Sequence, residues 1–291
     1  MDGVKQINIR EDNKVKKYQE YYVAFLDILG FKALLKDRTC EEIYSTFEIL
    51  HQNARGKLNL NGVDIQAYKH IHHIILSDSI IIYIKANKPD AFAALVHICN
   101  KLQYSLANRD KPILLRGAIA IGDLYHKKDV IYGSGLSSAY SLESNLAKYP
   151  RIIFTGDVLE RGLENTTYMF PYMEGFTNLY QKDKDSLYFV NYFSPDFWDT
   201  NILIKYYDSL NNICNEQLNQ AIEEGLRNKY IWLKKKVDKA IKMYPDVEKH
   251  YKEIEEKKQE QERLKYNKRF SIYSQQQIKL SVEYPEKISN K

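Results

Sequence analysis

The sequence predicts an α/β protein with a helical extension at its C-terminus. Short β-branched or aromatic runs alternate with segments of helical spacing as far as residue 154. Residues 197–241 then have helical spacing, and residues 247–268 are almost all charged or polar. With 291 residues, 44% of them apolar, and a mean hydropathy of −0.52, the chain is large enough for one folded domain and an extension.

The predicted core begins with an apolar run that ends just before Gly30 and is typical of a central strand. Asp78 is expected at the tip of a hairpin, between two β-branched runs. The predicted elements follow in this order: a strand over 21–28, helices over 31–35 and 41–54, hairpin strands over 65–76 and 80–84, a helix over 90–107, strands over 113–121 and 130–132, a helix over 136–147, and a strand over 151–154.

Composition changes along the chain predict three parts. Residues 1–18 are polar without an apolar period and are expected to form a flexible N-terminal arm. Residues 19–194 form the predicted folded domain. Residues 195–291 form a helical, charged extension, whose last part is expected to be a solvated helix or a coiled-coil arm.

Several classes of protein are disfavoured by the sequence. It contains no uncharged apolar run of about 18 residues, and its first twenty residues are rich in charge, so we expect neither a membrane span nor a signal peptide. Cys40, Cys99 and Cys214 lie far apart, which predicts no disulfide framework and favours the cytoplasm.

The positive charge of the chain is concentrated near its C-terminus. Residues 234–269 hold 13 Lys and Arg against 8 Asp and Glu, which accounts for the net charge of +5. The remainder is neutral, so no nucleic-acid partner is predicted.

Two aspartates stand out because each interrupts an apolar strand. Asp27 lies within the first predicted strand, and Asp78 lies between two isoleucine-rich runs. Because a buried carboxylate costs several kcal/mol unless it is compensated, a pair of them indicates a cation. Mg²⁺ and Mn²⁺ prefer carboxylate ligands and keep positions free for phosphate oxygens, which is the arrangement of phosphoryl transfer. The alternative is that each aspartate caps a helix or closes a turn.

Four segments, in order, resemble the motifs of class III nucleotide cyclases. They are residues 25–31 (FLDILGF), 76–79 (LSDS), 116–122 (RGAIAIG) and 132–144 (YGSGLSSAYSLES). The resemblance covers about residues 20–155 and implies a ferredoxin-like βαββαβ core that works as a head-to-tail homodimer. It identifies residues 19–194 as a nucleotide cyclase domain.

The resemblance also implies the site. Asp27 and Asp78, with the backbone carbonyl of Ile28, are expected to hold two Mn²⁺ or Mg²⁺ ions over a nucleoside triphosphate, which is converted to a 3',5'-cyclic nucleotide and pyrophosphate. Arg116 is expected to act as the catalytic cation, with Lys148 and Arg151 as other candidates. The nucleotide-binding residues are expected to be Phe25, Gly30, Phe31, Ser134, Ser137 and Ser141.

The sequence departs from the purine-cyclase pattern at four positions. Ile74 replaces the lysine that reads adenine, and Ser134 replaces an aspartate of the fourth motif. The asparagine and arginine that steady the nucleotide fall at Ser137 and Ser141. Phe25 shares the strand face of Asp27 and is expected either to reach a base pocket or to fill the core.

These departures make the chain most similar to the bacterial pyrimidine cyclases of Pycsar anti-phage systems. That similarity implies a uridylate cyclase that makes cUMP from UTP and signals to an effector activated by the cyclic nucleotide. The alternatives are a cytidylate or purine nucleotide cyclase, a cyclic-oligonucleotide synthase, and a catalytically degenerate module that only binds nucleotides.

Overall fold

A computed structural model describes residues 17–55, 57–60, 63–66, 70–166, 178–194, 199–220 and 223–283. The predicted N-terminal arm therefore lies almost wholly outside the described residues. The elements follow in this order: β1 Gln19–Ile28, α1 Phe31–Asp37, α2 Cys40–Ala54, β2 Lys57–Leu60, β3 Val63–Gln66, β4 His72–Leu76, β5 Ser79–Lys85, α3 Ala91–Ala107, β6 Leu115–Lys127, β7 Val130–Tyr132, α4 Ser134–Leu146, β8 Ile152–Phe154, α5 Gly156–Glu164, β9 Tyr180–Lys182, β10 Tyr188–Val190, α6 Thr200–Gln220, α7 Glu224–Ile241 and α8 Pro245–Glu283.

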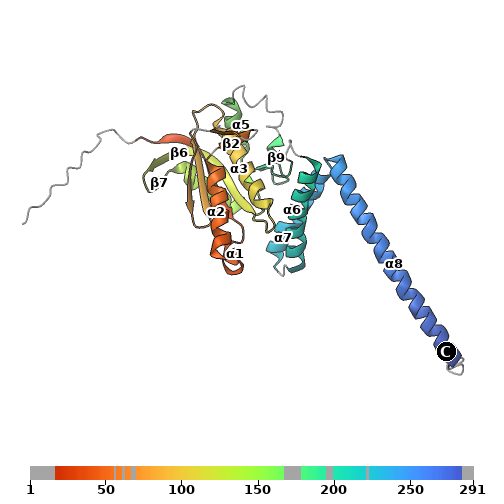
Figure 1. The fold of residues 1–291 in the computed structure, drawn as a ribbon. Coiled ribbons are helices and arrows are strands. Elements are labelled where there is room, and N and C mark those ends of the chain that lie inside the picture. The colour runs from red at the N-terminus through yellow and green to blue at the C-terminus, as the bar shows by residue number, and fades with distance from the viewer. Residues whose placement is uncertain are drawn as a thin grey trace, which may run out of the picture.

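The main sheet has the strand order β4-β5-β1-β6-β8-β10-β9, and β7 pairs with β6 (Figure 1). Its first four strands, with the helices that connect them, have the order of a ferredoxin-like βαββαβ unit. β1 lies inside the sheet and is antiparallel to both β5 and β6, whereas β8 runs parallel to β6. The mixed α/β fold with a helical C-terminal extension, predicted from the sequence, is confirmed.

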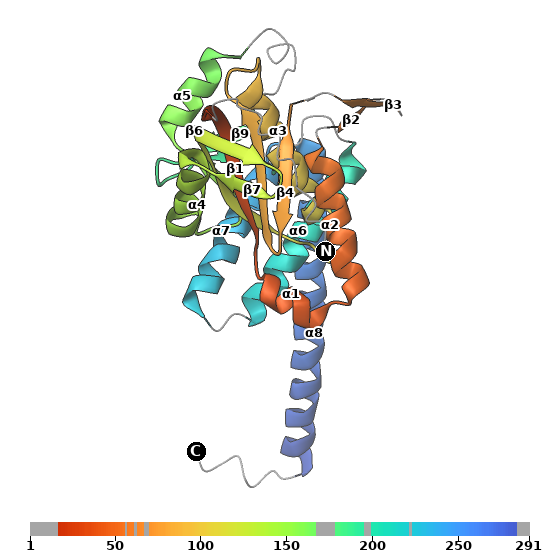
Figure 2. The same cartoon turned by 90° about the vertical axis from the view of Figure 1, so that its left-hand side faces the viewer.

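The two faces of β1 are covered by different helices. Tyr22, Leu26 and Ile28 are buried in a core cluster with residues of α2 and α3. Val23 and Phe25 belong to the opposite face, in a smaller cluster that includes Ala139 of α4. Figure 2 shows α4 on one side of the sheet and α2 and α3 on the other. Because side chains alternate along a strand, Asp27 shares the α4 face with Phe25.

Two predicted strands are corrected by the structure. The strand predicted over 65–76 is wrong: β3 pairs with β2 in a separate two-stranded sheet, and β4 begins only at His72. The β-branched residues favour strands but do not fix which partner a strand pairs with. The strand predicted over 113–121 begins at Leu115 and continues to Lys127, because β1 and β7 extend its pairing. The short elements α5, β9 and β10 have no counterpart among the predicted elements.

The helical extension packs on the sheet through α6 and α7. Tyr206, Tyr207 and Leu233 are buried in a second core cluster together with Phe189 of β10. The Tyr206 hydroxyl donates to the Tyr192 carbonyl at 2.8 Å, which ties α6 to the segment after β10. Aromatic burial and this hydrogen bond hold the extension against the core.

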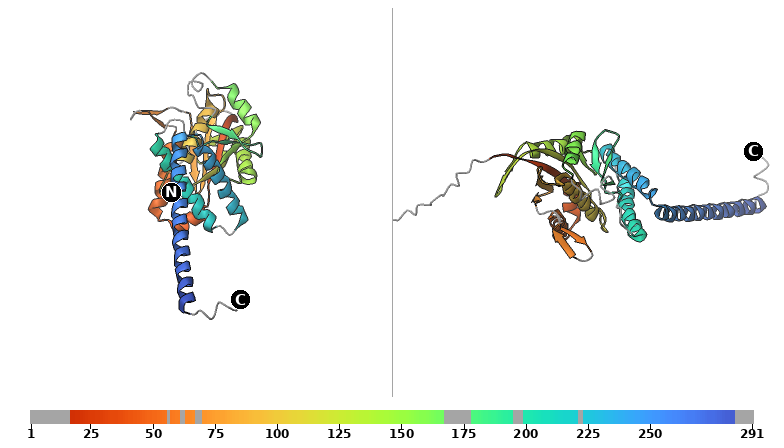
Figure 3. Two further views of the ribbon diagram at one scale, coloured as in Figure 1. Left: turned by 90° about the vertical axis from the view of Figure 1, so that its right-hand side faces the viewer. Right: turned by 90° about the horizontal axis from the view of Figure 1, so that it is seen from above.

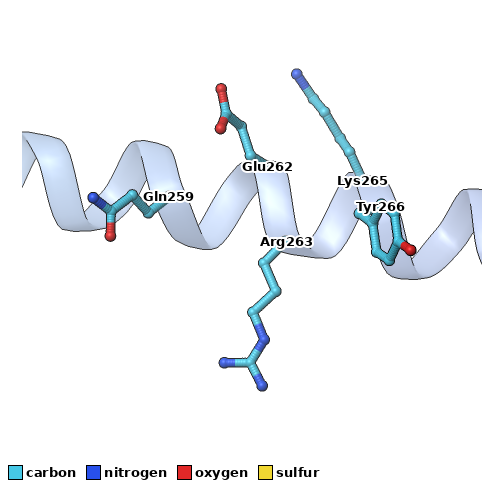
Figure 4. Close-up of a pocket in the computed structure, with 5 residues that line it drawn as sticks. All are labelled: Gln259, Glu262, Arg263, Lys265 and Tyr266. Atoms are coloured by element: carbon cyan, nitrogen blue, oxygen red, sulfur yellow. The ribbon is translucent and has the colours of Figure 1, made fainter.

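Helix α8 extends away from the rest of the molecule (Figure 3). The side chains of Gln259, Glu262, Arg263 and Lys265 point in different directions around this single helix and do not converge on a common point (Figure 4). Their exposure agrees with the predicted solvated arm. Among the described helices, none is both long and apolar enough to cross a bilayer.

Candidate functional site

The fold brings Asp27 and Asp78 to the same end of the sheet. Asp27 is next to last in β1 and pairs with Ser79 of β5 on one side and Arg116 of β6 on the other. Asp78 lies in the tight turn between β4 and β5, where the preceding Ser77 has a φ of 55°. The Asp78 carbonyl accepts a hydrogen bond from the Ile28 N–H at 3.0 Å. The backbone of the turn is thus bonded to the residue that follows Asp27.

Arg116 is shared between two carboxylates. Its Nε donates to Oδ2 of Asp27 at 3.0 Å and lies 2.9 Å from Oε1 of Glu143, which comes from α4. Nε carries one hydrogen, and that hydrogen is directed at Asp27, so the Glu143 oxygen has an ion-pair contact but no hydrogen bond. Glu143 is only 3% exposed. We call Asp27, Asp78, Arg116 and Glu143 the carboxylate cluster.

The carboxylate cluster contains more negative than positive charge. Burial raises the pKa of Asp27, the Arg116 guanidinium opposes that shift, and the negative charge of Asp78 adds to it. The Lys229 ammonium, from α7, lowers the pKa of Asp27 in part. Burial also raises the pKa of Glu143, against the effect of Arg116. Two carboxylates share one arginine, one of them has an unbonded buried oxygen, and a third carboxylate acts on Asp27, so a cation would stabilise this site.

The donor set fits a hard divalent cation. Within the described ranges, no group of three or more His, Cys, Asp and Glu residues forms a ready-made metal site. The oxygens that the sequence motifs assign to the ion are the carboxylates of Asp27 and Asp78 and the backbone carbonyl of Ile28. Mg²⁺ and Mn²⁺ are commonly held by one or two carboxylates, with water and substrate phosphates filling the remaining positions. The residues present fit such an ion.

A cavity of about 370 Å³ lies between the sheet and α4, and Phe25, close to Asp27 in β1, forms part of its wall. Phe25 and Tyr140 lie edge to face in its wall, with ring centroids 5.3 Å apart. Phe25 is two residues before Asp27 on the same strand face, and Tyr140 is one helical turn before Glu143. The cavity is lined by Phe25, Ile81, Ile131, Tyr132, Gly133, Leu136, Ser137 and Tyr140. A largely apolar cavity with aromatic walls thus adjoins a charged cluster.

The other predicted nucleotide-binding residues have separate positions. Gly30 has a φ of 73° where β1 turns into α1, a conformation that favours glycine. Phe31 packs against Phe47 of α2, with ring centroids 6.1 Å apart, on the opposite face of the sheet from the cavity. Ser134 accepts a hydrogen bond from the Asp123 N–H at 3.0 Å. Ser141 is exposed on α4 and accepts a hydrogen bond from Asn145 at 3.2 Å.

Arg151 belongs to a second group of buried charges. Its guanidinium is fully buried and donates to Asp183 at 2.6 Å and to Asp185. Asp183 also accepts hydrogen bonds from Trp232 at 2.8 Å and from Lys236 at 3.0 Å, both on α7. Although burial raises the pKa of Asp183, the hydrogen bonds that it accepts hold that pKa below its ordinary value. We call Arg151, Asp183, Asp185, Trp232 and Lys236 the Arg151 cluster.

This pairing gives Arg151 a structural role, and Lys148, the other candidate cation, is exposed after α4. Three residues of the site were not among the predicted site residues: Glu143, Tyr140 and Lys229. The spacing of Tyr140 and Glu143 on one helix face is a signal that could have identified them. Lys229 carries no such signal, because its proximity to Asp27 depends on how α7 packs.

Comparisons with known proteins give weak likenesses. No protein-family model and no curated protein matches the chain. The monomeric guanylyl cyclase domain of the RhoGC fusion protein from Blastocladiella emersonii matches with a TM-score of 0.42 and 14% identity, covering 60% of this chain and 96% of that domain. An adenylate/guanylate cyclase/hydrolase from Silicibacter pomeroyi matches with a TM-score of 0.39 and 15% identity, covering 62% and 100%.

A class III adenylyl cyclase-like ATP-binding protein from Pseudomonas aeruginosa matches with a TM-score of 0.39 and 11% identity, covering 60% of this chain and 39% of that one. Likenesses of this size identify neither a family nor an activity. The function of this chain is therefore argued from its site.

Proposed function

We propose that this protein is a metal-dependent nucleotide cyclase, with its cyclase domain in residues 19–194. The observation that carries the proposal is the carboxylate cluster, in which Asp27 and Asp78 share one end of the sheet and negative charge exceeds positive. The neighbouring cavity supports it, since a nucleotide combines a flat ring with a charged triphosphate. Domain boundaries and site roles follow the sequence motifs.

Each residue of the cluster has a distinct role in this proposal. Asp27 and Asp78 bind two Mn²⁺ or Mg²⁺ ions, and the Ile28 carbonyl completes the protein ligands. Bound there, divalent ions would neutralise the triphosphate and favour ionisation of the ribose 3'-hydroxyl. Arg116 holds the Asp27 carboxylate in place, and Glu143 in turn fixes Arg116. A rigid sheet that aligns the two reacting groups of one molecule supplies much of the rate enhancement.

We propose a pyrimidine triphosphate as the substrate, UTP in preference to CTP. Ile74 pairs with Ile81, which lines the cavity, so this side of it offers apolar contact and no charged group to read a purine. Phe25 and Tyr140 would stack on the base or bind its edges. On the motif resemblance to pyrimidine cyclases, we propose that the product, cUMP, is a second messenger that activates an effector in anti-phage defence.

The proposed assembly is a head-to-tail homodimer, in which each site uses residues of both protomers. Turnover per chain, measured over a range of protein concentrations together with the oligomeric state, tests this arrangement. If each site needs both protomers, turnover per chain falls when dilution dissociates the dimer. Full turnover per chain by a monomer would contradict shared sites.

A cyclic-oligonucleotide synthase is the alternative enzyme. The β4–β5 turn carries a single acidic residue, Asp78, which argues against a turn with two metal-binding acids. Mass spectrometry of the product separates the two reactions, because a cyclic mononucleotide and a cyclic dinucleotide differ in mass. A module that only binds nucleotides would be stabilised by nucleotide and Mn²⁺ without turnover.

The decisive experiment incubates the full chain with Mn²⁺ and each of ATP, GTP, CTP and UTP. We expect a cyclic monophosphate and pyrophosphate, most rapidly from UTP. Asp27→Ala and Asp78→Ala should each reduce turnover by about a thousandfold or more. Asp110→Ala, which removes an exposed aspartate outside the site, serves as the matched control. Equal turnover in the wild type and both site variants would reject the proposal.

A further inference from the structure

The second helix of the extension, α7, carries a lysine on the face that packs against the Arg151 cluster. Lys229, Trp232 and Lys236 are spaced by three and four residues, so they lie along one face of α7. Trp232 and Lys236 donate to Asp183, and the Trp232 ring stacks on Tyr149 with an interplanar angle of 4°. This face of α7 is therefore anchored on the Arg151 cluster.

The Arg151 cluster lies next to the carboxylate cluster in the sheet. The Arg151 carbonyl accepts a hydrogen bond from the Gly117 N–H at 3.1 Å, and Arg116, which precedes Gly117, pairs with Asp27. Arg151, Arg116 and Asp27 thus follow one another across adjacent strands, which are about 5 Å apart. Lys229 lies about 4.5 Å along the helix axis from Trp232, a distance close to the spacing between two adjacent strands.

Core packing agrees with this placement. Tyr230, the neighbour of Lys229, is buried in the second core cluster, and Leu29 and Leu142 pack against the same cluster. Leu29 follows Asp27 by two residues, and Leu142 precedes Glu143. Figures 1 and 2 both draw the first turns of α7 at the end of the sheet where β1 leads into α1. The Lys229 ammonium is near enough to lower in part the pKa of Asp27, which burial raises.

The first part of α7 is also a source of a second cation. Helix α4, which carries Ser137, Ser141 and Ser144 on its exposed side, contains no Lys or Arg. Arg116 is engaged by Asp27 and Glu143. Lys229 is only partly buried, so its flexible side chain can reach a ligand.

We propose that Lys229 contacts the polyphosphate of the nucleotide substrate, so that the helical extension supplies a phosphate-binding cation to the site built by the sheet. The identity of the substrate rests on the proposed function. The contact itself requires only a polyphosphate anion held beside Asp27.

The test compares the wild-type chain with Lys229→Ala, Lys229→Arg and Lys235→Ala. Lys235 is an exposed lysine on the same helix and serves as the matched control. The probes are UTP turnover and calorimetric binding of inorganic triphosphate, both with Mn²⁺. Since a hydrogen bond from a charged donor is lost, Lys229→Ala should raise both the KM for UTP and the Kd for triphosphate about tenfold or more, with a smaller change in kcat. Lys229→Arg should stay within a few-fold of the wild type, and Lys235→Ala should match it.

Equal triphosphate affinity in the wild type and Lys229→Ala, or no binding by the wild type, would overturn the inference. Loss of binding together with a lowered thermal unfolding temperature would also overturn it, because the lysine would then be structural. If the wild type turns over no nucleotide but Lys229→Ala still weakens triphosphate binding, the cyclase proposal fails while the phosphate contact stands.

Discussion

The two groups of buried charge in this protein are compensated differently. In the Arg151 cluster, Arg151 and Lys236 face Asp183 and Asp185, and each carboxylate accepts hydrogen bonds from the chain. The Arg151 Nε is the one buried polar side-chain atom of that cluster without a partner among the described residues. In the carboxylate cluster, Asp27 and Glu143 share Arg116, Asp78 adds a third negative charge, and a buried oxygen of Glu143 has no hydrogen bond.

This difference distinguishes a cluster that stabilises the fold from a cluster that we propose binds a metal ion. A set of charges that the chain itself neutralises can hold α7 against the sheet without any ligand. A set with surplus negative charge is costly in the free protein, and a bound cation recovers that cost. We therefore expect substitutions in the Arg151 cluster to change stability and substitutions in the carboxylate cluster to change metal binding and turnover.

The largest effect on stability is expected from Arg151→Met. It leaves Asp183 and Asp185 without their buried arginine and should lower the free energy of unfolding in urea by about 3–5 kcal/mol. Addition of Mn²⁺ should not restore the lost free energy of unfolding. Arg161→Met is the control, because Arg161 forms only exposed ion pairs, which contribute about 1 kcal/mol or less. A loss for Arg151→Met no greater than the control's would show that the Arg151 cluster does not stabilise the fold.

Addition of Mn²⁺ should stabilise the wild-type protein but not Asp27→Asn. At a free ion concentration of 100 times the Kd, the gain is about 2.7 kcal/mol, measurable as a higher unfolding temperature. Because burial raises the pKa of Asp27, protons compete with the ion for this carboxylate, and the gain should fall as the pH decreases through that raised value. A gain that is unchanged by Asp27→Asn would place the ion elsewhere.

The aromatic wall of the cavity should affect substrate binding more than the rate of chemistry. Tyr140→Ala removes the ring that meets Phe25 and should raise the KM for UTP about tenfold, since stacking of a base on an aromatic ring is worth about 1–3 kcal/mol. Tyr140→Phe keeps the ring and is the matched control. If both variants have the KM of the wild type, the base binds outside this cavity.

The smallest effect is the pH dependence of the metal-free protein. The raised pKa values of Asp27 and Glu143 favour their protonated forms in the folded state. As the pH falls through these values toward the ordinary carboxyl range, the folded state therefore gains stability relative to the unfolded chain from these two groups. Glu143→Gln should reduce this gain in urea unfolding measured at several pH values. An unchanged pH profile would mean that Glu143 is not protonated on folding in this range.

The strands and the acidic pair of Asp27 and Asp78 could be predicted from the sequence because both depend on local signals. The apolar run of β1 and the turn at Asp78 are visible in consecutive residues, and alternation places Phe25 and Asp27 on one face. The compensation of charge was not predictable, because Arg116 is 89 residues from Asp27 and Arg151 is 32 from Asp183. The assignment of β3 to a separate sheet was missed for a different reason, because β3 pairs with β2, the strand just before it, and no strand was predicted over 57–60.

The central claim is that Asp27 and Asp78 together bind the divalent ions, and a double-mutant cycle of Mn²⁺ affinity tests it most directly. Calorimetry on the wild type, Asp27→Asn, Asp78→Asn and the double variant gives the four dissociation constants. We expect each single variant to lose most of the affinity and the double variant to lose little more, because the second substitution removes a ligand from a site already lost. Single variants that bind Mn²⁺ as tightly as the wild type would contradict the claim.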